Sequence, residues 1–207
     1  MKLYYAPHAC SLAPHIVARE AGIPIELVEV DLATHTLKKD GADYLAINPR
    51  GYVPALELDD GTVLTEVAAL VQYLADLKPE YGLAPRAGTL DRVKLQAWLT
   101  FIGTELHKQF SPWLWHADTA ESTVQAVKTK IATRLAELDR VFAAQPYLMG
   151  ERFTVADAYA FAIVSWAPMM KMDLSGRSAL VAWLARVGSR AKVKEAIAAE
   201  RTKREAA

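Results

Sequence analysis

The sequence predicts an α/β domain followed by an all-helical domain, and three observations support this division. The first 80 residues alternate between the two-residue period of strands and the longer period of helices. From residue 90 onward only the helical period remains. Between these regions, helix-breaking residues crowd together: Pro79, Gly82, Pro85 and Gly88. We therefore expect an α/β domain over residues 1–80, a linker over 81–88 and a helical domain over 89–207.

The α/β region begins with a predicted βαβ unit. Residues 2–6 are a short β-prone run, and residues 11–21 have helical spacing that stops at Gly22. Residues 25–30 then alternate as a strand, and a weak helix is expected near residues 42–45.

A predicted β-hairpin and a helix complete this region. The alternating runs 55–58 and 62–64 are joined by Asp59-Asp60-Gly61, a strong hairpin signal. Residues 66–77 carry apolar side chains on one helical face. The whole order is βαβ, helix, ββα.

The second domain shows helices only. We expect one over residues 90–115, one through 124–138, one after Thr154, and two more over 179–187 and 193–200, before a charged tail over 201–207. Thr154-Val155-Ala156-Asp157 has the form of a capping box, in which both end side chains satisfy backbone N–H groups at a helix start.

Composition narrows the function classes. Lysine and arginine number 24, as do aspartate and glutamate, so no net charge favours nucleic acid or a membrane surface. The longest apolar stretch, 158–170, is shorter than the roughly 18 residues of a membrane span, and the N-terminus lacks a signal-peptide pattern. The single cysteine forms no internal disulfide, and no spacing suggests a metal site, so we expect a cytoplasmic protein.

Cys10 is the first candidate for chemistry. It lies between the first strand and the first helix, where the helix dipole would lower the pKa of a thiol and provide a nucleophile. A lone cysteine is more commonly a small buried hydrophobe. Ala13 stands where a resolving cysteine would be, which excludes a two-cysteine mechanism.

Two further sites flank strands of the same domain. Pro54 lacks an N–H, which leaves the Val53 backbone available to an extended peptide, although ordinary turn chemistry explains the pair equally well. Glu66 and Val67 open a helix, where an acid often only compensates the helix dipole. The carboxylate of Glu66 could bind an amine and the N–H of Val67 a carboxylate, so the pair would also suit the headgroup of an amino acid.

The helix near residue 100 has a polar side. At about 100° per residue, Thr100, Thr104, His107 and Lys108 cluster opposite a broad apolar face. A solvated stripe is the simplest explanation. Alternatively, the stripe faces the first domain across a cleft, where His107 near a thiol could hold or transfer a proton.

These residues resemble the bacterial beta-class glutathione transferases, which have a thioredoxin-like domain followed by a helical domain. The resemblance runs almost end to end, and its most specific pieces are Ala9-Cys10-Ser11-Leu12, Asn48-Pro49-x-Gly-x-Val53-Pro54, Leu64-Thr65-Glu66, Thr104-Glu105-Leu106-His107-Lys108 and Phe153-Thr154-Val155-Ala156-Asp157. Together these motifs are far more specific than any one alone.

The resemblance implies roles for particular residues. Cys10 would contact the glutathione sulfur or form a mixed disulfide with it, and Val53, before a cis Pro54, would pair with the cysteinyl backbone. Glu66 and Val67 would hold the γ-glutamyl end. Thr104, Glu105 and Lys108 would border the cleft, with His107 beside the thiol. The resemblance also implies a homodimer.

Three residues depart from the family pattern. His8 stands where glycine is common, His35 where a lysine often meets the glycyl carboxylate, and Thr100 where asparagine is common. Because a histidine loses its charge near pH 6.5, a charged His35 predicts glutathione affinity that weakens from about pH 6 to 8.

The sequence thus predicts an enzyme that uses glutathione as co-substrate, with no permanently bound cofactor, and conjugates it to a hydrophobic electrophile. Thiol–disulfide activity through Cys10 is also expected. A non-catalytic ligand carrier or interaction module is the alternative, and isomerisation or dehalogenation stays open. Trp113, Trp115 and Trp166 are candidates for the wall of the second-substrate site.

Overall fold

The computed structural model describes residues 1–205, with side chains described up to residue 201. The chain forms two compact units. The first contains Met1–Ala84 together with the chain from Arg190 onward, and the second contains Pro85–Ser189.

The first unit is built on a mixed five-stranded sheet. Its strands are β1 (Lys2–Tyr5), β2 (Glu26–Asp31), β3 (Thr36–Leu37), β4 (Ala55–Glu57) and β5 (Val63–Thr65), in the order β3-β2-β1-β4-β5. β1 pairs with β2 in parallel, and every other pairing is antiparallel. The predicted βαβ unit and hairpin are confirmed. β3 was not expected, because two residues are too few to show a period.

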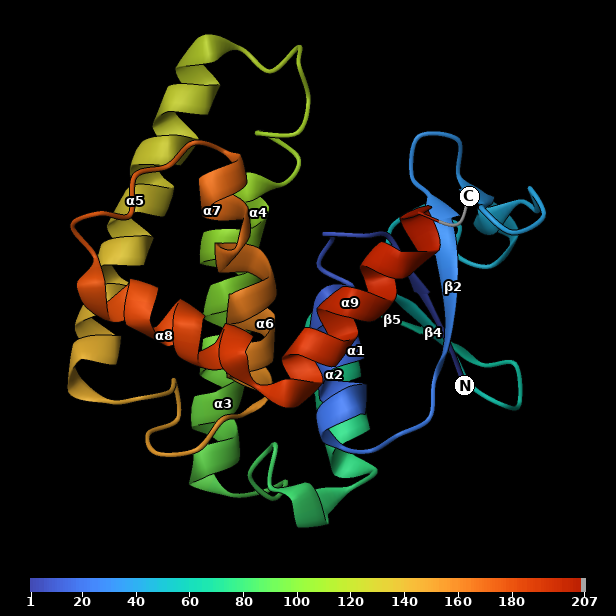
Figure 1. Cartoon of the computed structure of the whole chain (residues 1–207), viewed down its shortest axis with the longest axis horizontal. Coiled ribbons are helices and arrows are strands. Elements are labelled where there is room, and N and C mark those ends of the chain that lie inside the picture. Colours follow the sequence, from blue (N-terminus) through green and yellow to red (C-terminus); the bar gives the residue numbers. More distant parts are fainter. Residues whose placement is uncertain (206–207) are drawn as a thin grey trace. The chain divides into compact units, whose positions relative to one another are not determined.

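Helices α1 (Leu12–Glu20) and α2 (Val67–Asp76) lie against the same face of this sheet and contact each other (Figure 1). Their inner faces are apolar and buried, as the spacing of Ile16, Val17, Leu70 and Leu74 predicts. The weak helix expected near 42–45 is a single 3-10 turn, Tyr44–Ala46, begun by Asp43, whose carboxylate accepts from the N–H of Leu45. A second 3-10 turn spans Pro79–Tyr81.

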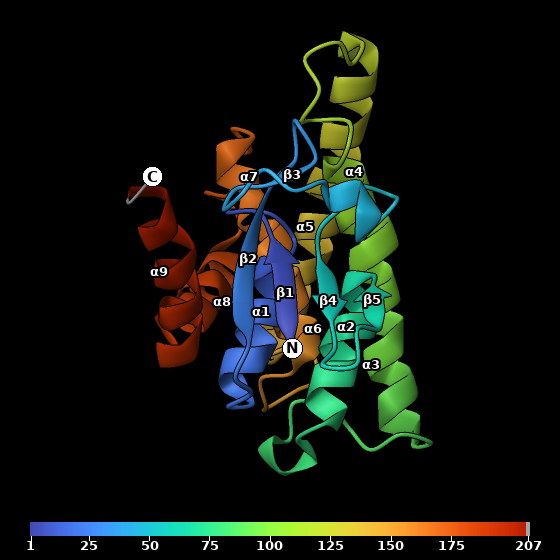
Figure 2. The same ribbon diagram turned by 90° about the vertical axis from the view of Figure 1, so that its right-hand side faces the viewer.

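The C-terminal helix differs from the expected division. α9 (Ala191–Glu205) contacts α1 of the first unit, whereas the sequence analysis placed residues 89–207 in one helical domain (Figures 1 and 2). Fully buried Val193 and Ala196 explain the packing, but a helical period does not reveal which neighbour a helix covers. The helix also continues to Glu205, through most of the expected charged tail; residues 206–207 lie outside the described residues.

The second unit is helical throughout its described elements. These are α3 (Leu90–Phe101), a π-helix (Ile102–His107), α4 (Lys108–Phe110), α5 (Glu121–Ala144), α6 (Val155–Val164), α7 (Trp166–Met169) and α8 (Ser178–Ser189). Every residue of α6 is buried, and α6 contacts α3, the π-helix, α7 and α8. The capping box of Thr154 and Asp157 is present at its start.

The long helix expected over 90–115 ends at Phe110. Ser111 is extended and precedes Pro112, which has no N–H to continue the helical hydrogen bonds. The six-residue π-helix before it was not expected, because the period of a helix in sequence does not distinguish the two hydrogen-bonding patterns.

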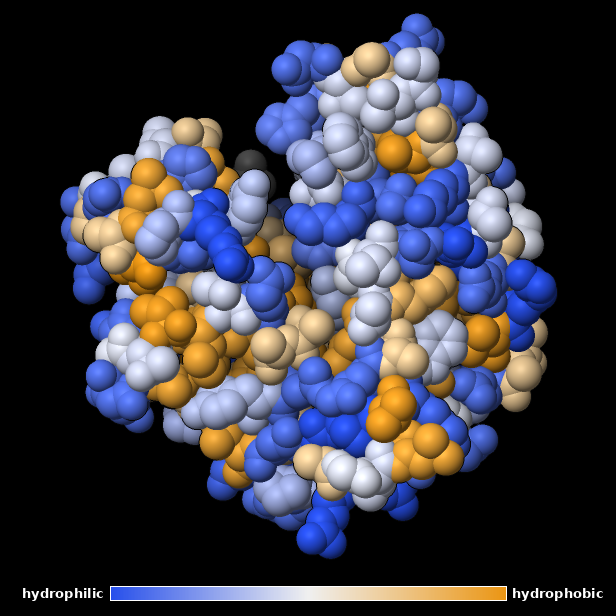
Figure 3. Space-filling view, turned by 180° about the vertical axis from the view of Figure 1, so that it is seen from behind, coloured by the Kyte–Doolittle hydropathy of each residue, from blue (hydrophilic) through white to orange (hydrophobic). Residues whose placement is uncertain are grey.

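Large apolar side chains remain at several surface positions, including Tyr52, Leu90, Val93, Trp113 and Trp115. Figure 3 shows hydrophobic atoms in separate groups among hydrophilic ones on the face it presents. Within the described part of the chain, every helix is too short or too polar to cross a bilayer.

Candidate functional site

Cys10 lies in the connection between β1 and α1. Its side chain is buried, with 8% of its surface exposed, and its thiol donates to the carbonyl oxygen of Val53 at 3.3 Å. The neighbouring Ser11 hydroxyl accepts from the N–H of Ala6 and donates to the Ala6 carbonyl, both at 3.2 Å. Ser11 therefore closes the loop that carries Cys10. Sequence reasoning missed this role, because a serine beside a cysteine gives no separate signal.

This contact favours the thiol over the thiolate. A carbonyl oxygen accepts a hydrogen bond from S–H but repels the anion. At the start of α1, the N–H groups of Leu12 and Ala13 bond to the carbonyls of Ala9 and Cys10. The nucleophile expected at this helix end thus requires Sγ to leave the Val53 carbonyl.

The loop that presents Val53 is held by its own polar contacts. The Val53–Pro54 bond is cis, as the family resemblance implied. The carbonyl of Tyr52 accepts from the hydroxyl of Tyr44 at 2.8 Å and from Nδ2 of Asn48 at 2.7 Å. Tyr44 and Asn48 were not recognised as supports, since Asn48-Pro49 was interpreted only as a turn.

Sheet register places Glu66 near the same edge. Ala55 pairs with Tyr4 on one side and with Thr65 on the other. The residues that follow β1 and β5, and those that precede β4, therefore gather at one edge of the sheet. The first unit brings Cys10, Val53 and Glu66 together there.

Glu66 begins α2 in a left-handed backbone conformation, with φ of 70°. This conformation is uncommon for a residue with a side chain, and such residues concentrate at functional sites. Its exposed carboxylate pairs with Arg50 at 3.1 Å. Val67 follows as the first helical residue and is buried. Arg50 was not among the expected site residues.

His35 packs over the backbone of Gly51. A Cβ on Gly51 would lie 2.8 Å from Nδ1 of His35 and 2.7 Å from its Cε1. Nδ1 is buried, and it has no hydrogen-bond partner among the described residues. A proton on Nδ1 would be a buried donor without an acceptor, so this geometry favours the tautomer with its proton on Nε2. The charged His35 of the sequence-based expectation stays a prediction.

The polar residues near position 100 have diverse surroundings. Thr100 and Thr104 are exposed and donate to carbonyls one turn earlier, and Lys108 is exposed. Glu105 instead accepts from Nε and Nη2 of Arg134 at 2.9 and 2.7 Å, which holds the pKa of its carboxyl below the usual value. Within the second unit Glu105 therefore fastens the π-helix to α5.

His107 is turned toward α6. Its Nδ1 lies 2.8 Å from the hydroxyl of Tyr159, and its ring meets the edge of Trp166 at 5.3 Å between centroids. Burial first, and the nearby charge of Lys108 second, lower its pKa to about 4. His107 is thus neutral at pH 7, with a proton on only one of its two ring nitrogens. The rotation of 100° per residue does not hold through the π-helix, so His107 does not share the exposure of Thr104 and Lys108.

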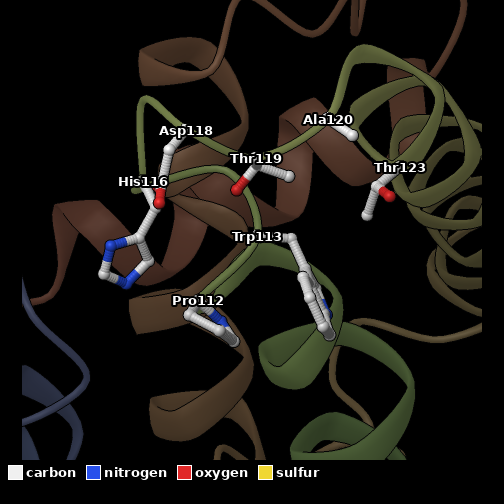
Figure 4. A pocket seen from close by; sticks show the side chains of 7 residues that line it. All are labelled: Pro112, Trp113, His116, Asp118, Thr119, Ala120 and Thr123. Carbon is white, nitrogen blue, oxygen red and sulfur yellow. The ribbon is translucent and has the colours of Figure 1, made fainter.

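The three tryptophans proposed for the second-substrate wall are not equivalent. Trp115 and Trp166 meet edge to face at 5.5 Å, and Trp166 is buried. Trp113 instead lines a hollow of about 330 Å³ together with Pro112, His116, Asp118, Thr119, Ala120 and Thr123. Figure 4 shows Trp113 and Pro112 on one side of this hollow and the start of α5 on another.

Comparison with known families identifies both units. Residues 9–77 match the family model described as the N-terminal domain of glutathione S-transferase, and residues 101–191 match its C-terminal domain. The chain belongs to the glutathione S-transferase family. Its thioredoxin-like first unit and helical second unit agree with this membership.

Individual relatives narrow the class. Glutathione S-transferase GstA of Escherichia coli O157:H7 is 44% identical, over 97% of this chain and 98% of its own. Glutathione S-transferase GST-4.5 of Xanthomonas campestris pv. campestris is 37% identical, over 97% and 98%. The expected enzyme class, a glutathione-conjugating transferase, is confirmed by these relatives.

Solved structures agree. BphK, a bacterial glutathione S-transferase in a ternary complex, has a TM-score of 0.94 at 48% identity, covering 97% of this chain and 99% of that chain. The beta-class enzyme of Sphingomonas chungbukensis has a TM-score of 0.93 at 42% identity, covering 97% and 99%. The predicted resemblance to the bacterial beta class is confirmed.

Proposed function

We propose that this glutathione S-transferase binds glutathione at the sheet edge that carries Cys10, Val53 and Glu66, and transfers it to a hydrophobic electrophile. The observation that carries the proposal is the hydrogen bond from the Cys10 thiol to the Val53 carbonyl. It joins a nucleophilic side chain to a backbone segment suited to an extended peptide.

Each part of glutathione has a matching group in the first unit. The Val53 backbone pairs with the cysteinyl residue, beside Pro54, which has no N–H. The carboxylate of Glu66 takes the γ-glutamyl ammonium, and the N–H of Val67 takes its carboxylate. Nε2–H of His35 donates to the glycyl carboxylate. A ligand ammonium competes with Arg50 for Glu66, since that ion pair is exposed and weak.

Binding at Val53 also changes Cys10. A peptide that pairs with the Val53 backbone competes for the carbonyl that holds the thiol. Released from that carbonyl, Sγ loses the contact that opposes its ionisation. Substrate binding and activation of Cys10 are therefore coupled through one atom.

The chain also exchanges disulfides. The Cys10 thiolate attacks the glutathione sulfur of a mixed disulfide between glutathione and another thiol, which forms a Cys10–glutathione mixed disulfide and releases the other thiol as its thiolate. A second glutathione thiolate attacks the mixed disulfide, regenerates Cys10 and leaves as oxidised glutathione. The second glutathione takes the place of a resolving cysteine, which this sequence lacks.

Residues of the second unit complete the proposal. Thr100, Thr104 and Lys108 offer exposed polar groups for glutathione, and Trp113 and Trp115 offer apolar surface for the electrophile, with buried Trp166 packed against Trp115. His107 acts as a neutral hydrogen-bond donor: if Nδ1 accepts from Tyr159, its proton lies on Nε2. Glu105 acts through its ion pair with Arg134 and keeps the π-helix in place.

We further propose a cytoplasmic homodimer. The single cysteine fits a reducing compartment. Leu90 and Val93, three residues apart on α3, are 70% and 58% exposed, which is unusual for apolar residues on one helical face and suits a subunit interface.

Intact mass spectrometry of the protein after incubation with oxidised glutathione tests the role of Cys10. We expect addition of one glutathione to the wild type and none to Cys10→Ala. Disulfide-reducing activity should be lost in Cys10→Ala, whereas conjugation persists if other groups bind the glutathione thiolate. Wild-type disulfide reduction in Cys10→Ala would refute the nucleophile assignment.

A non-catalytic ligand carrier is the alternative function. Calorimetric titration with glutathione separates it from a scaffold that binds nothing, and steady-state conjugation of a model electrophile separates it from an enzyme. Binding without turnover of any electrophile would favour the carrier.

A further inference from the structure

Two polar contacts fasten α9 to α1. Just before α9 begins, Arg190 pairs with Glu20 through two bonds, Nε to Oε1 at 2.6 Å and Nη2 to Oε2 at 2.8 Å. Farther along α9, Oε1 of Glu200 lies 2.9 Å from Nδ1 of His15. His15 is fully buried and Glu200 is 4% exposed. A buried carboxylate is costly, so one that persists needs specific partners.

The hydrogen bonds around His15 define its tautomer. Arg19 Nε lies 3.3 Å from Nε2 of His15, and an arginine can only donate. Nε2 is therefore the acceptor, and the ring proton sits on Nδ1, where it is donated to Glu200. The same carboxylate also accepts from the backbone N–H of His8. Glu200 thus binds groups on both sides of Cys10 in the chain.

His8 needs this support. It has φ of 63°, in the left-handed region that favours glycine, only two residues before Cys10. Such a conformation persists where surrounding contacts hold it. The N–H bond to Glu200 is a contact of this kind. On the other side of Cys10, His15 lies in the first turn and a half of α1 and is held by the same carboxylate.

We propose that Glu200 is a positioning residue for Cys10, so that the C-terminal helix sets the geometry of the glutathione site. By holding His8 and His15, it keeps the intervening loop in the conformation in which Cys10 is buried against Val53. Glu200 does not touch the reacting sulfur. The inference rests on the proposed function, and it extends the site to a helix that the sequence analysis assigned to the other domain.

Glu200→Gln tests the proposal, with Glu195→Gln as its matched control on the same helix. In the first variant a neutral amide with one acceptor oxygen replaces the charged carboxylate, so both donors are held more weakly. Glu195 is exposed and pairs only with Lys192 in the described structure. The readouts are the rate of Cys10 alkylation by iodoacetamide, followed by intact mass, and the KM for glutathione, well below the melting temperature of each variant.

We expect Glu200→Gln to alkylate about tenfold faster than the wild type, because a loosened loop exposes the buried thiol, and to have a raised KM. Glu195→Gln should stay within about twofold, since exposed pairs contribute little. If Glu200→Gln does not fold, Glu200→Asp replaces it, because the shorter side chain cannot reach both partners. An unchanged or slower alkylation rate with a lower melting temperature would show a purely structural role and overturn the proposal.

A second variant separates loop positioning from general loosening. Glycine adopts the φ of His8 without strain, so the double variant His8→Gly/Glu200→Gln should return alkylation toward the wild-type rate. Absence of this recovery would contradict the role assigned to His8. If the wild type neither binds nor conjugates glutathione, the proposed function fails, while the alkylation comparison still decides the positioning role.

Discussion

The hydroxyl of Tyr159 lies 2.8 Å from Nδ1 of His107, inside the second unit, where burial lowers the pKa of that histidine to about 4. In the unfolded chain the same histidine has a pKa of about 6.5. The folded state therefore binds this proton less readily than the unfolded state. Its contribution to stability is fully present above about pH 6.5 and is lost as the pH falls toward 4.

His107→Gln should remove this dependence while keeping a polar partner for Tyr159. For the wild type, the titration of His107 should lower the free energy of unfolding by about 2 kcal/mol between pH 7.5 and 5. Urea denaturation of both proteins at the two pH values measures the difference, because all other titrating groups are shared. Equal losses in the two proteins would contradict the lowered pKa of His107.

Gly51 and Gly41 offer a matched pair for His35. Both have positive φ, 70° and 73°, so alanine strains the backbone at either position. Only at Gly51 would the new Cβ collide with His35; nothing lies within 4 Å at Gly41. We expect Gly51→Ala to weaken glutathione binding by about tenfold, with Gly41→Ala near wild type, measured by calorimetric titration. Equal affinities in the two variants would remove His35 from the proposed site.

The fold was predictable because its elements carry strong local patterns. Glycine and aspartate mark the hairpin between β4 and β5, and the Thr154 capping box marks the start of α6. α9 shows the limit: its period predicts a helix, but not that the helix packs on α1, where Glu200 meets His15, 185 residues away in the chain. No local pattern encodes such a pairing.

The site was predictable in part for the same reason. Cys10, Val53 and Glu66 follow or precede strand ends, and the order of strands gathers strand ends at one edge. The supporting residues Ser11 and Asn48 bind backbone atoms four or five residues away in the same loops, and the residue type alone does not predict such contacts. His107 was placed by an α-helical rotation that the π-helix does not follow.

Asp157 tests how much a buried hydrogen-bond network contributes to the stability of the second unit. Its carboxylate accepts from the N–H groups of Leu148 and Thr154, from the Thr154 hydroxyl and from Nε1 of Trp183. All of these lie in buried surroundings, so Asp157→Ala leaves several donors without acceptors. We expect a loss of about 3 to 5 kcal/mol in the free energy of unfolding.

Asp139→Ala is the matched control for this prediction. The carboxylate of Asp139 accepts from the N–H of Leu180 at 2.9 Å near the start of α8, in a partly buried position. Removing this one bond should cost about 1 kcal/mol, the usual value for a helix cap. Because both variants delete a carboxylate that binds a helix start, their difference in urea denaturation isolates the effect of burial and of the additional donors. If the two losses are equal, the network around Asp157 adds nothing beyond an ordinary cap, and α6 is held by its apolar contacts alone.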